Sequence, residues 1–204
     1  MTEDFSTINT VEELEAYYGS PRPAALVKVA RRMTAEYARW IEASRFCALG
    51  TVGPDGLDVS PRGDRDPVVA ILDETTLALP DRRGNDRLDS LRNVVQDPRV
   101  SLMFMVPGEN NVVRVIGTGA VSTNPELLNR FGVDGALPRS VILVRIGEIY
   151  FQCARALIRS ELWTSEKTAN LPTVGEILAA MSGGAEGGKG YDRDWNARAQ
   201  KTMW

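Results

Sequence analysis

The stretch RFCALGTVGPDGLDVSPRGDRD, residues 45–66, decides the fold of this chain. An apolar run at 46–52 is followed by the turn sequence GPDG at 53–56 and by a second short extended segment, a pattern that predicts a β-hairpin. The second strand leads into a polar cluster that contains Ser60 and Arg62. Because a guanidinium group can bind two phosphate oxygens at once, an arginine at the end of a strand can form part of an anion-binding site.

Further strand-like segments follow this hairpin. A second hairpin is predicted at 67–79, and longer extended segments are predicted at 99–106, 112–122 and 141–153. Gly117 predicts a bend or bulge in the 112–122 segment. Two successive hairpins indicate antiparallel pairing rather than alternating strands and helices. We therefore predict a mainly β protein with helical additions, of the α+β class, whose six or more antiparallel strands form a small closed or split barrel.

Helices are predicted before, between and after the strands. The spacing of a capping box at Thr10 predicts a short N-terminal helix, and the helical region 23–44 is predicted to break near Thr34. Asn85 is a good N-cap for a central helix. Other helices are predicted after Asn124, after Ala154, at 173–181 and in the C-terminal tail, whereas GGAEGGKG, residues 183–190, is predicted to be a flexible linker.

The composition is that of an ordinary globular protein. The chain has 204 residues, of which 43% are hydrophobic, and its net charge is −3. One structural domain is expected: 1–44 as an N-terminal helical extension packing on the barrel, 45–153 as the barrel core, and 154–204 as C-terminal helices and a loop. No apolar run is long enough to cross a bilayer and the acidic N-terminus is unlike a secretory signal, so we expect no membrane partner and a cytoplasmic location.

The acidic net charge argues against nucleic acid as a partner. An oligonucleotide-binding barrel of the OB type is the alternative in that class, but such barrels use basic and aromatic strands that this sequence lacks. The two tryptophans of the C-terminal tail indicate that the tail docks either on its own domain or on a second subunit.

The chain contains no histidine. This excludes Ser-His and Cys-His nucleophilic dyads, and it removes the commonest ligand of zinc and haem, so we expect no metal site. An enzyme built on this chain would rely on a bound cofactor. Cys47 and Cys153 each lie in an apolar segment without CxxC spacing, and both are predicted to be buried reduced thiols.

A second group of basic residues precedes the central helix. Arg82, Arg83 and Arg87 bracket the start of this helix, with Asn85 at its expected cap. A helix N-terminus and arginine side chains together would suit a terminal phosphomonoester. The alternative is that these arginines, with Arg62, are surface residues paired with aspartates at positions 64, 66, 81 and 86.

Several motifs occur in an order that resembles a known family. DVSPRGD (58–64), TLALPDRRGNDRLDSLRN (76–93), DPRVSLMFMVPG (97–108), VRVIG (113–117) and CARALIRSELW (153–163) are similar to the FMN-binding split barrels of the pyridoxamine 5′-phosphate oxidase-like family. The resemblance implies a six-stranded antiparallel split β-barrel. It also implies a homodimer with FMN at the subunit interface.

The resemblance also implies roles for particular residues. Arg62 matches the arginine that reaches the FMN phosphate, and Ser60 is its neighbour. The loop residues Arg82, Arg83, Asn85 and Arg87 match the basic segment that completes the phosphate pocket. Ser160 and Trp163 match polar and aromatic positions that approach the flavin, with the other subunit as their expected source.

The chain departs from the family pattern at three places. Val112 stands where a glutamine is expected, which argues against direct contact from this strand to the ring edge. The helix PELLNRFG (125–132) lacks the Tyr/Arg/Ser set that holds the vitamin B6 phosphate, and an Arg-His-Arg motif is impossible without histidine. Oxidation of pyridoxamine phosphate is therefore not expected, and haem degradation through a histidine ligand is not expected either.

These observations predict an FMN-dependent oxidoreductase that acts on an unknown small molecule. NADH or NADPH is a candidate electron donor, and relatives that use a deazaflavin are a further possibility. No side chain is assigned as the catalytic acid or base. The alternative is a non-catalytic FMN-binding carrier or redox sensor, which would share the cofactor but not the turnover.

Overall fold

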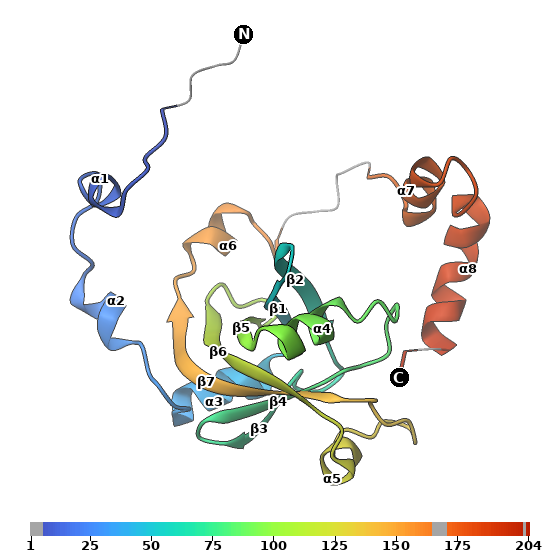
Figure 1. The fold of residues 1–204 in the computed structure, drawn as a ribbon, viewed down its shortest axis with the longest axis horizontal. Coiled ribbons are helices and arrows are strands. Elements are labelled where there is room, and N and C mark those ends of the chain that lie inside the picture. The colour runs from blue at the N-terminus through green and yellow to red at the C-terminus, as the bar shows by residue number, and fades with distance from the viewer. Residues whose placement is uncertain (1–5, 165–170, 202) are drawn as a thin grey trace.

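The computed structural model describes residues 6–164, 171–201, 203 and 204, and these form one antiparallel sheet with helices around it (Figure 1). The sheet has the strand order β2-β1-β5-β6-β7-β4-β3. Its strands are β1 Phe46–Gly53, β2 Gly56–Gly63, β3 Ala70–Asp73, β4 Thr76–Pro80, β5 Arg99–Met105, β6 Val112–Ser122 and β7 Val141–Gln152. The helices are α1 Val11–Glu15, α2 Pro23–Val27, α3 Ala35–Ala43, α4 Asp89–Gln96, α5 Pro125–Asn129, α6 Arg155–Arg159, α7 Val174–Met181 and α8 Gly188–Lys201.

The α+β class and both hairpins are confirmed, and the sheet has seven strands, which agrees with six or more but not with the count of six that the family resemblance implied. The short strand β3 of the second hairpin pairs antiparallel with β4, from Ala70 opposite Ala78 to Asp73 opposite Thr76, and it forms one edge of the sheet. The other edge is β2. The hydrogen-bonded order therefore runs from β2 to β3 without closing, and the division of the sheet into a split barrel stays a prediction.

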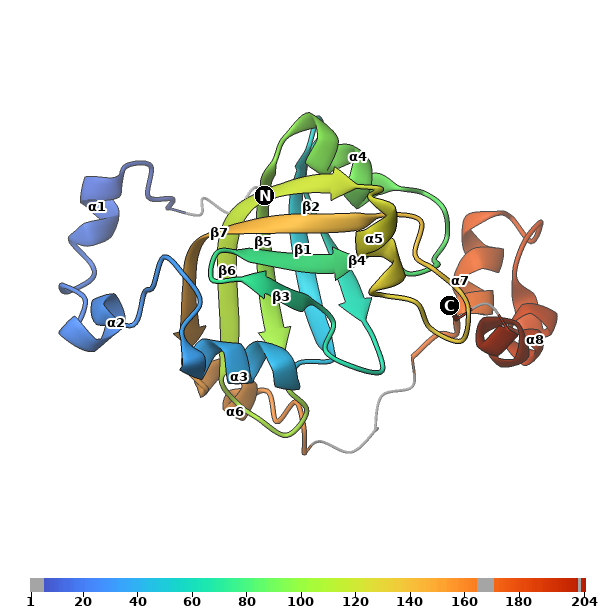
Figure 2. The same cartoon turned by 90° about the horizontal axis from the view of Figure 1, so that it is seen from below.

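The sheet curls because its two longest strands bend. The pairing of β6 with β7 shifts register between Ile116 and Gly117, which confirms the predicted bulge. At this point a Cβ on residue 117 would overlap the carbonyl oxygen of Arg145 on β7. Glycine is therefore required for the two backbones to approach each other. Figure 2 shows the resulting curvature, with α3 and α4 on different sides of the curled strands.

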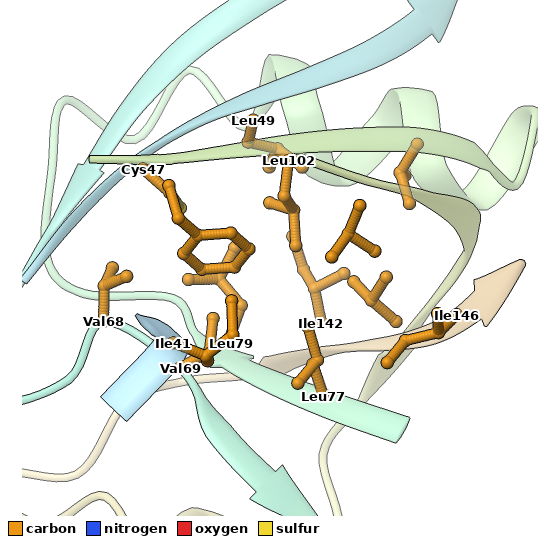
Figure 3. Close-up of a cluster of buried hydrophobic side chains, with 14 of the residues drawn as sticks. Ile41, Cys47, Leu49, Val68, Val69, Leu77, Leu79, Leu102, Ile142 and Ile146 are labelled. Atoms are coloured by element: carbon orange, nitrogen blue, oxygen red, sulfur yellow. The ribbon is translucent and has the colours of Figure 1, made fainter. Parts of the chain in front are cut away.

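The core lies inside the curl. Figure 3 shows side chains of β1 and β5, such as Leu49 and Leu102, facing those of β4 and β7, such as Leu79 and Ile142. Ile41 of α3 is fully buried against this cluster. Burial of aliphatic side chains at this density supplies most of the stability of such a sheet.

The N-terminal helices differ in how they contact the sheet. The predicted break near Thr34 is confirmed, because Thr34 accepts a hydrogen bond from the backbone N–H of Tyr37 as the N-cap of α3. The capping box at Thr10 is also present in α1. However, α1 and α2 bury none of their residues, and both views place them away from the sheet. The division into 1–44, 45–153 and 154–204 stays a prediction, and it includes positions outside the described residues.

The predicted N-cap of the central helix is wrong. The helix α4 begins at Asp89 rather than near Asn85, and its N-cap residue Leu88 has a φ of +63°. The Asn85 side chain instead accepts a hydrogen bond from the backbone N–H of Arg87, at 3.2 Å. This local turn competes with helix formation, so the segment before α4 remains an irregular loop.

The glycine-rich segment 183–190 is not the flexible linker that the sequence suggested. It forms the turn between α7 and α8, and α8 already begins at Gly188. Asp192 of α8 accepts hydrogen bonds from the Thr173 hydroxyl at 2.6 Å and from the Gly175 N–H at 2.8 Å. The side chain of Asp192 therefore joins the two helices into a hairpin. No helix within the described residues is long and apolar enough to cross a membrane.

The two cysteines differ in burial. Cys47 is fully buried on β1, as predicted, but Cys153 is exposed because β7 ends at Gln152. Burial raises the pKa of the Cys47 thiol from its ordinary value of 9.0 to about 12, although the nearby Arg62 guanidinium acts in the opposite direction. The folded protein therefore keeps this proton at alkaline pH where the unfolded chain loses it.

The difference between the pKa of Cys47 in the folded and the unfolded chain predicts a loss of stability at high pH. The contribution of the protonated Cys47 thiol to the free energy of unfolding is fully present below pH 9. It is lost as the pH rises from about 9 to 12, at up to about 1.4 kcal/mol per pH unit. Cys47→Ala should make the free energy of unfolding fall less steeply between about pH 9 and 10.5. The measurement is urea unfolding across this range, with Cys153→Ala as a matched control that keeps the wild-type slope. Equal slopes for wild type and Cys47→Ala would contradict the prediction.

Candidate anion-binding site

A pocket of about 830 Å³ lies where β2, the loop between β4 and α4, and the segment before β7 meet. This volume is within the range of small-molecule sites, about 300–1,000 Å³. Six of the eight site residues predicted from the sequence line it: Ser60, Arg62, Arg82, Arg83, Asn85 and Arg87. The fold thus brings together two segments that are about 20 residues apart in the chain.

The pairing of β2 with β1 decides which β2 side chains reach the pocket. Alternate side chains of a strand point to opposite faces. Asp58, Ser60 and Arg62 line the pocket, whereas Leu57 and Val59 are 85% and 68% exposed on the other face. The regular hairpin register, with Arg62 opposite Cys47, fixes this choice.

Arg62 is held in place from two sides. Its Nε donates to the Ser60 hydroxyl at 3.2 Å, and its Nη1 lies 2.9 Å from Oδ1 of Asp81. The side chains of Arg62 and Asp81 are each only 18% exposed. Within the described residues Nη2 of Arg62 donates to no group, so this nitrogen is available to a ligand.

All three side-chain nitrogens of Arg82 have partners, in contrast to those of Arg62. Its Nε and Nη2 both lie 2.8 Å from Oδ2 of Asp64, and its Nη1 donates to the carbonyl oxygen of Phe131 at 2.6 Å. The side chains of Arg82 and Asp64 are 17% and 5% exposed. These bonds tie the loop after β4 to β2 and to the segment after α5, which is the geometry of a structural arginine.

The remaining loop residues are more exposed. Arg87 pairs with Asp89 at 2.9 Å, and its side chain is 73% exposed. Arg83 is exposed and forms no ion pair with any residue that the structure describes. It is therefore a cation in the pocket wall without a carboxylate to neutralise it.

The alternative interpretation, in which these arginines are surface residues paired with aspartates, is correct in part. Arg62 and Arg82 do pair with Asp81 and Asp64, and Arg139 lies 3.3 Å from Asp86. The first two pairs, however, are mostly buried in the pocket wall rather than solvated. They fix the guanidinium groups in one geometry, as a preformed anion site requires.

Ser160 and Trp163 lie elsewhere. They follow α6, and neither lines the pocket. The Trp163 Nε1–H donates to the carbonyl oxygen of Glu109 at 2.8 Å, and the Ser160 hydroxyl donates to that of Leu157 at 3.1 Å. One chain alone therefore does not bring these two residues to the arginines.

Other pocket residues were not anticipated. The Ser90 hydroxyl lies 3.0 Å from that of Ser60 and 3.4 Å from Oδ2 of Asp58. The alternation of residues 58, 60 and 62 along β2 could have identified Asp58. No local signal could have identified Ser140 or Trp204, because tertiary folding brings them in from distant parts of the chain.

Trp204 also shows where the C-terminal tail docks. Its ring lies 4.5 Å from the Arg65 guanidinium carbon and 5.3 Å from that of Arg82. Such distances allow cation–π attraction. Within this chain, Trp204 therefore lies against its own domain, which is one of the two docking sites that the sequence left open for the tail.

The structure is thus an α+β protein with a curled antiparallel sheet and an arginine-lined pocket beside its edge strand β2. The family model of pyridoxamine 5′-phosphate oxidase matches residues 33–153, which is more than half of the chain. The chain therefore belongs to this family, whose members often bind flavin. The resemblance inferred from the sequence motifs is confirmed at the level of the family.

The chain is also similar to solved structures of low sequence identity. HupZ from Group A Streptococcus is 15% identical, with a TM-score of 0.47 over 57% of this chain and 91% of HupZ. General stress protein 26 from Bacillus anthracis is 17% identical, with a TM-score of 0.43 over 56% and 88%. An F420 reductase is 22% identical, with a TM-score of 0.42 over 59% and 98%. No curated protein matches the chain.

Proposed function

We propose that this protein binds FMN and acts in the cytoplasm as a flavin-dependent oxidoreductase on a small molecule. One observation carries the proposal: β2 places Ser60 and a half-buried, pre-oriented Arg62 in a pocket that Arg83 and Arg87 also line. Guanidinium and hydroxyl groups are the donors that a terminal phosphate requires. The pocket volume also suits a ligand of the size of FMN.

The loop arginines are expected to have different roles. We assign phosphate contact to Arg62, through its free Nη2, and to Arg83, which lacks a carboxylate partner among the described residues. Arg87 adds positive charge from the rim, although Asp89 neutralises part of it. Arg82 shapes the pocket through Asp64 and Phe131, and Asn85 holds the turn between Arg83 and Arg87.

We also propose that the protein is a homodimer with FMN at the subunit interface. The outer face of the sheet supports this, because it exposes apolar side chains on neighbouring strands: Phe46, Leu57, Val59 and Met103. An exposed apolar patch of this kind marks a protein–protein contact. In such a dimer, Ser160 and Trp163 of one subunit would approach the flavin of the other.

When bound, FMN supplies the electron transfer. This chain offers no histidine for acid–base work. The chain's own residues bind and orient. Arg62 and Arg83 hold the phosphate end, and the buried pairs Arg62–Asp81 and Arg82–Asp64 keep the pocket wall rigid. NADH or NADPH is the proposed electron donor.

Cofactor reconstitution tests this proposal. The purified protein should be yellow, and the apoprotein should bind FMN but not riboflavin, because riboflavin lacks the phosphate that the arginines hold. Absorbance titration measures the affinity, and light scattering of the holoprotein should give about twice the chain mass of 22.4 kDa. Colourless protein that takes up no added FMN would overturn the proposal.

The second candidate is a non-catalytic FMN-binding carrier or redox sensor. The absence of histidine from the chain favours it, because no side chain is assigned as a proton donor or acceptor. Anaerobic mixing of the holoprotein with NADH or NADPH separates the two candidates. An oxidoreductase that uses these donors bleaches the flavin absorbance within seconds, whereas a carrier leaves it unchanged.

A further inference from the structure

A buried hydroxyl in the pocket wall lacks a partner. Ser140 lies directly before β7, is 6% exposed and lines the same pocket as Arg62. Among the described residues, its Oγ is the only buried side-chain polar atom without a hydrogen bond. Its carbonyl oxygen accepts a hydrogen bond from the N–H of Asp81 at 2.9 Å, so Ser140 adjoins the residue that holds Arg62.

An unpartnered buried hydroxyl costs free energy, because it has lost water and gained nothing in return. Other buried serines of this chain avoid that cost. The Ser44 hydroxyl donates to the carbonyl oxygen of Trp40 at 2.7 Å, and the Ser90 hydroxyl interacts with Ser60 and Asp58. In native proteins, a buried polar group without a partner is explained by stored strain, a catalytic role, or a bound water or ion.

We propose that Ser140 is a ligand-binding residue, whose hydroxyl donates a hydrogen bond to the anionic group that Arg62 holds. Ser140 belongs to a third segment of the pocket lining, residues 136–140, which lines the pocket together with β2 and the loop before α4. Arg139 lies in the same segment, and its side chain is 79% exposed. The ligand class is a phosphomonoester, and in this respect the inference rests on the proposed function.

This role predicts opposite effects on the free and the bound protein. Removing a hydroxyl that has no partner should leave the ligand-free protein as stable as wild type or more stable. Removing a donor to a charged phosphate should weaken ligand binding by about tenfold or more. A serine with a purely structural role would show the reverse pattern.

The experiment compares Ser140→Ala with Ser44→Ala, a buried serine that is satisfied and lies outside the pocket. Urea unfolding of the FMN-free proteins and titrations with FMN and with inorganic phosphate are measured for both. We expect Ser140→Ala to keep its urea midpoint and to bind both ligands about tenfold more weakly. Ser44→Ala should lower the midpoint and keep FMN affinity within about twofold of wild type, because neither Ser44 nor its partner Trp40 lines the pocket.

Two results would overturn the inference. One is unchanged affinity of Ser140→Ala for both ligands, which an ordered water beside the hydroxyl would produce. The other is a fall in its ligand-free urea midpoint as large as that of Ser44→Ala. If wild-type protein bound phosphate but not FMN, the proposed function would fail, and the phosphate titrations would still decide the role of Ser140. Binding of neither ligand by wild type would overturn both.

Discussion

Arg62→Ala should abolish FMN retention during purification and should also destabilise the ligand-free protein. A hydrogen bond to a charged group contributes about 1.5–3 kcal/mol, so losing the guanidinium should weaken FMN binding by about 10- to 100-fold. The same change leaves Asp81, whose side chain is 18% exposed, without its cation. Removing one partner of a buried ion pair costs about 3–5 kcal/mol, and we expect the low end of that range here.

A double variant separates the two effects. Arg62→Ala with Asp81→Ala should recover much of the lost stability, because no unpaired carboxylate remains, but it should not recover FMN affinity. Arg99→Ala is the matched control, since Arg99 pairs with Asp97 outside the pocket and its side chain is 71% exposed. FMN titration and urea unfolding are the measurements. Wild-type FMN affinity in Arg62→Ala would remove this residue from the cofactor site.

Gly117→Ala should be the most destabilising of the glycine substitutions at the sheet. A Cβ there would overlap the Arg145 carbonyl oxygen, which is backbone and cannot rotate away as a side chain can. One of the two long strands must therefore shift. Overpacking of this kind costs about 1–3 kcal/mol or more, and we expect at least the upper value. The urea midpoint of unfolding measures the effect.

Gly19→Ala supplies the control for this prediction. Nothing lies within 4 Å of a Cβ at residue 19, and its backbone is not left-handed. Its stability should stay near that of wild type or rise by about 0.4–1 kcal/mol, because alanine restricts the unfolded chain. If Gly117→Ala unfolded at the wild-type midpoint, the backbone at the bulge would have to relax without cost. The inference that the close approach of β6 and β7 requires glycine at residue 117 would then be wrong.

Patterns that depend on nearby residues predicted the structure well. The GPDG turn, the capping box at Thr10, the break near Thr34 and the bulge at Gly117 are all present. The turn and the helix caps depend on hydrogen bonding within a few residues of the motif. The bulge involves the distant strand β7, but a glycine within a strand marks it in the sequence. Ser60 and Arg62, which the sequence grouped in one polar cluster, lie on the same face of β2.

Features that depend on distant packing were missed or misread. Asn85 has the composition of an N-cap, but two residues with positive φ, at 86 and 88, delay the helix to Asp89. Cys153 looked buried because its neighbours are apolar, yet it lies just past the end of β7. The approach of residues 136–140 to β2 is decided by the β7 register, which sequence spacing does not reveal.

The position of β2 at the sheet edge has a consequence for how molecules of this protein associate. An exposed edge strand can recruit strands from other molecules and so lead to aggregation. The edge strand β2 contains Pro61, which has no main-chain N–H that could donate to an added strand. The outward side chains of the same strand, Leu57 and Val59, remain free for contact through the face of the sheet. The sequence SPRGD thus discourages open-ended growth along the edge while leaving the face available for a closed, two-subunit assembly.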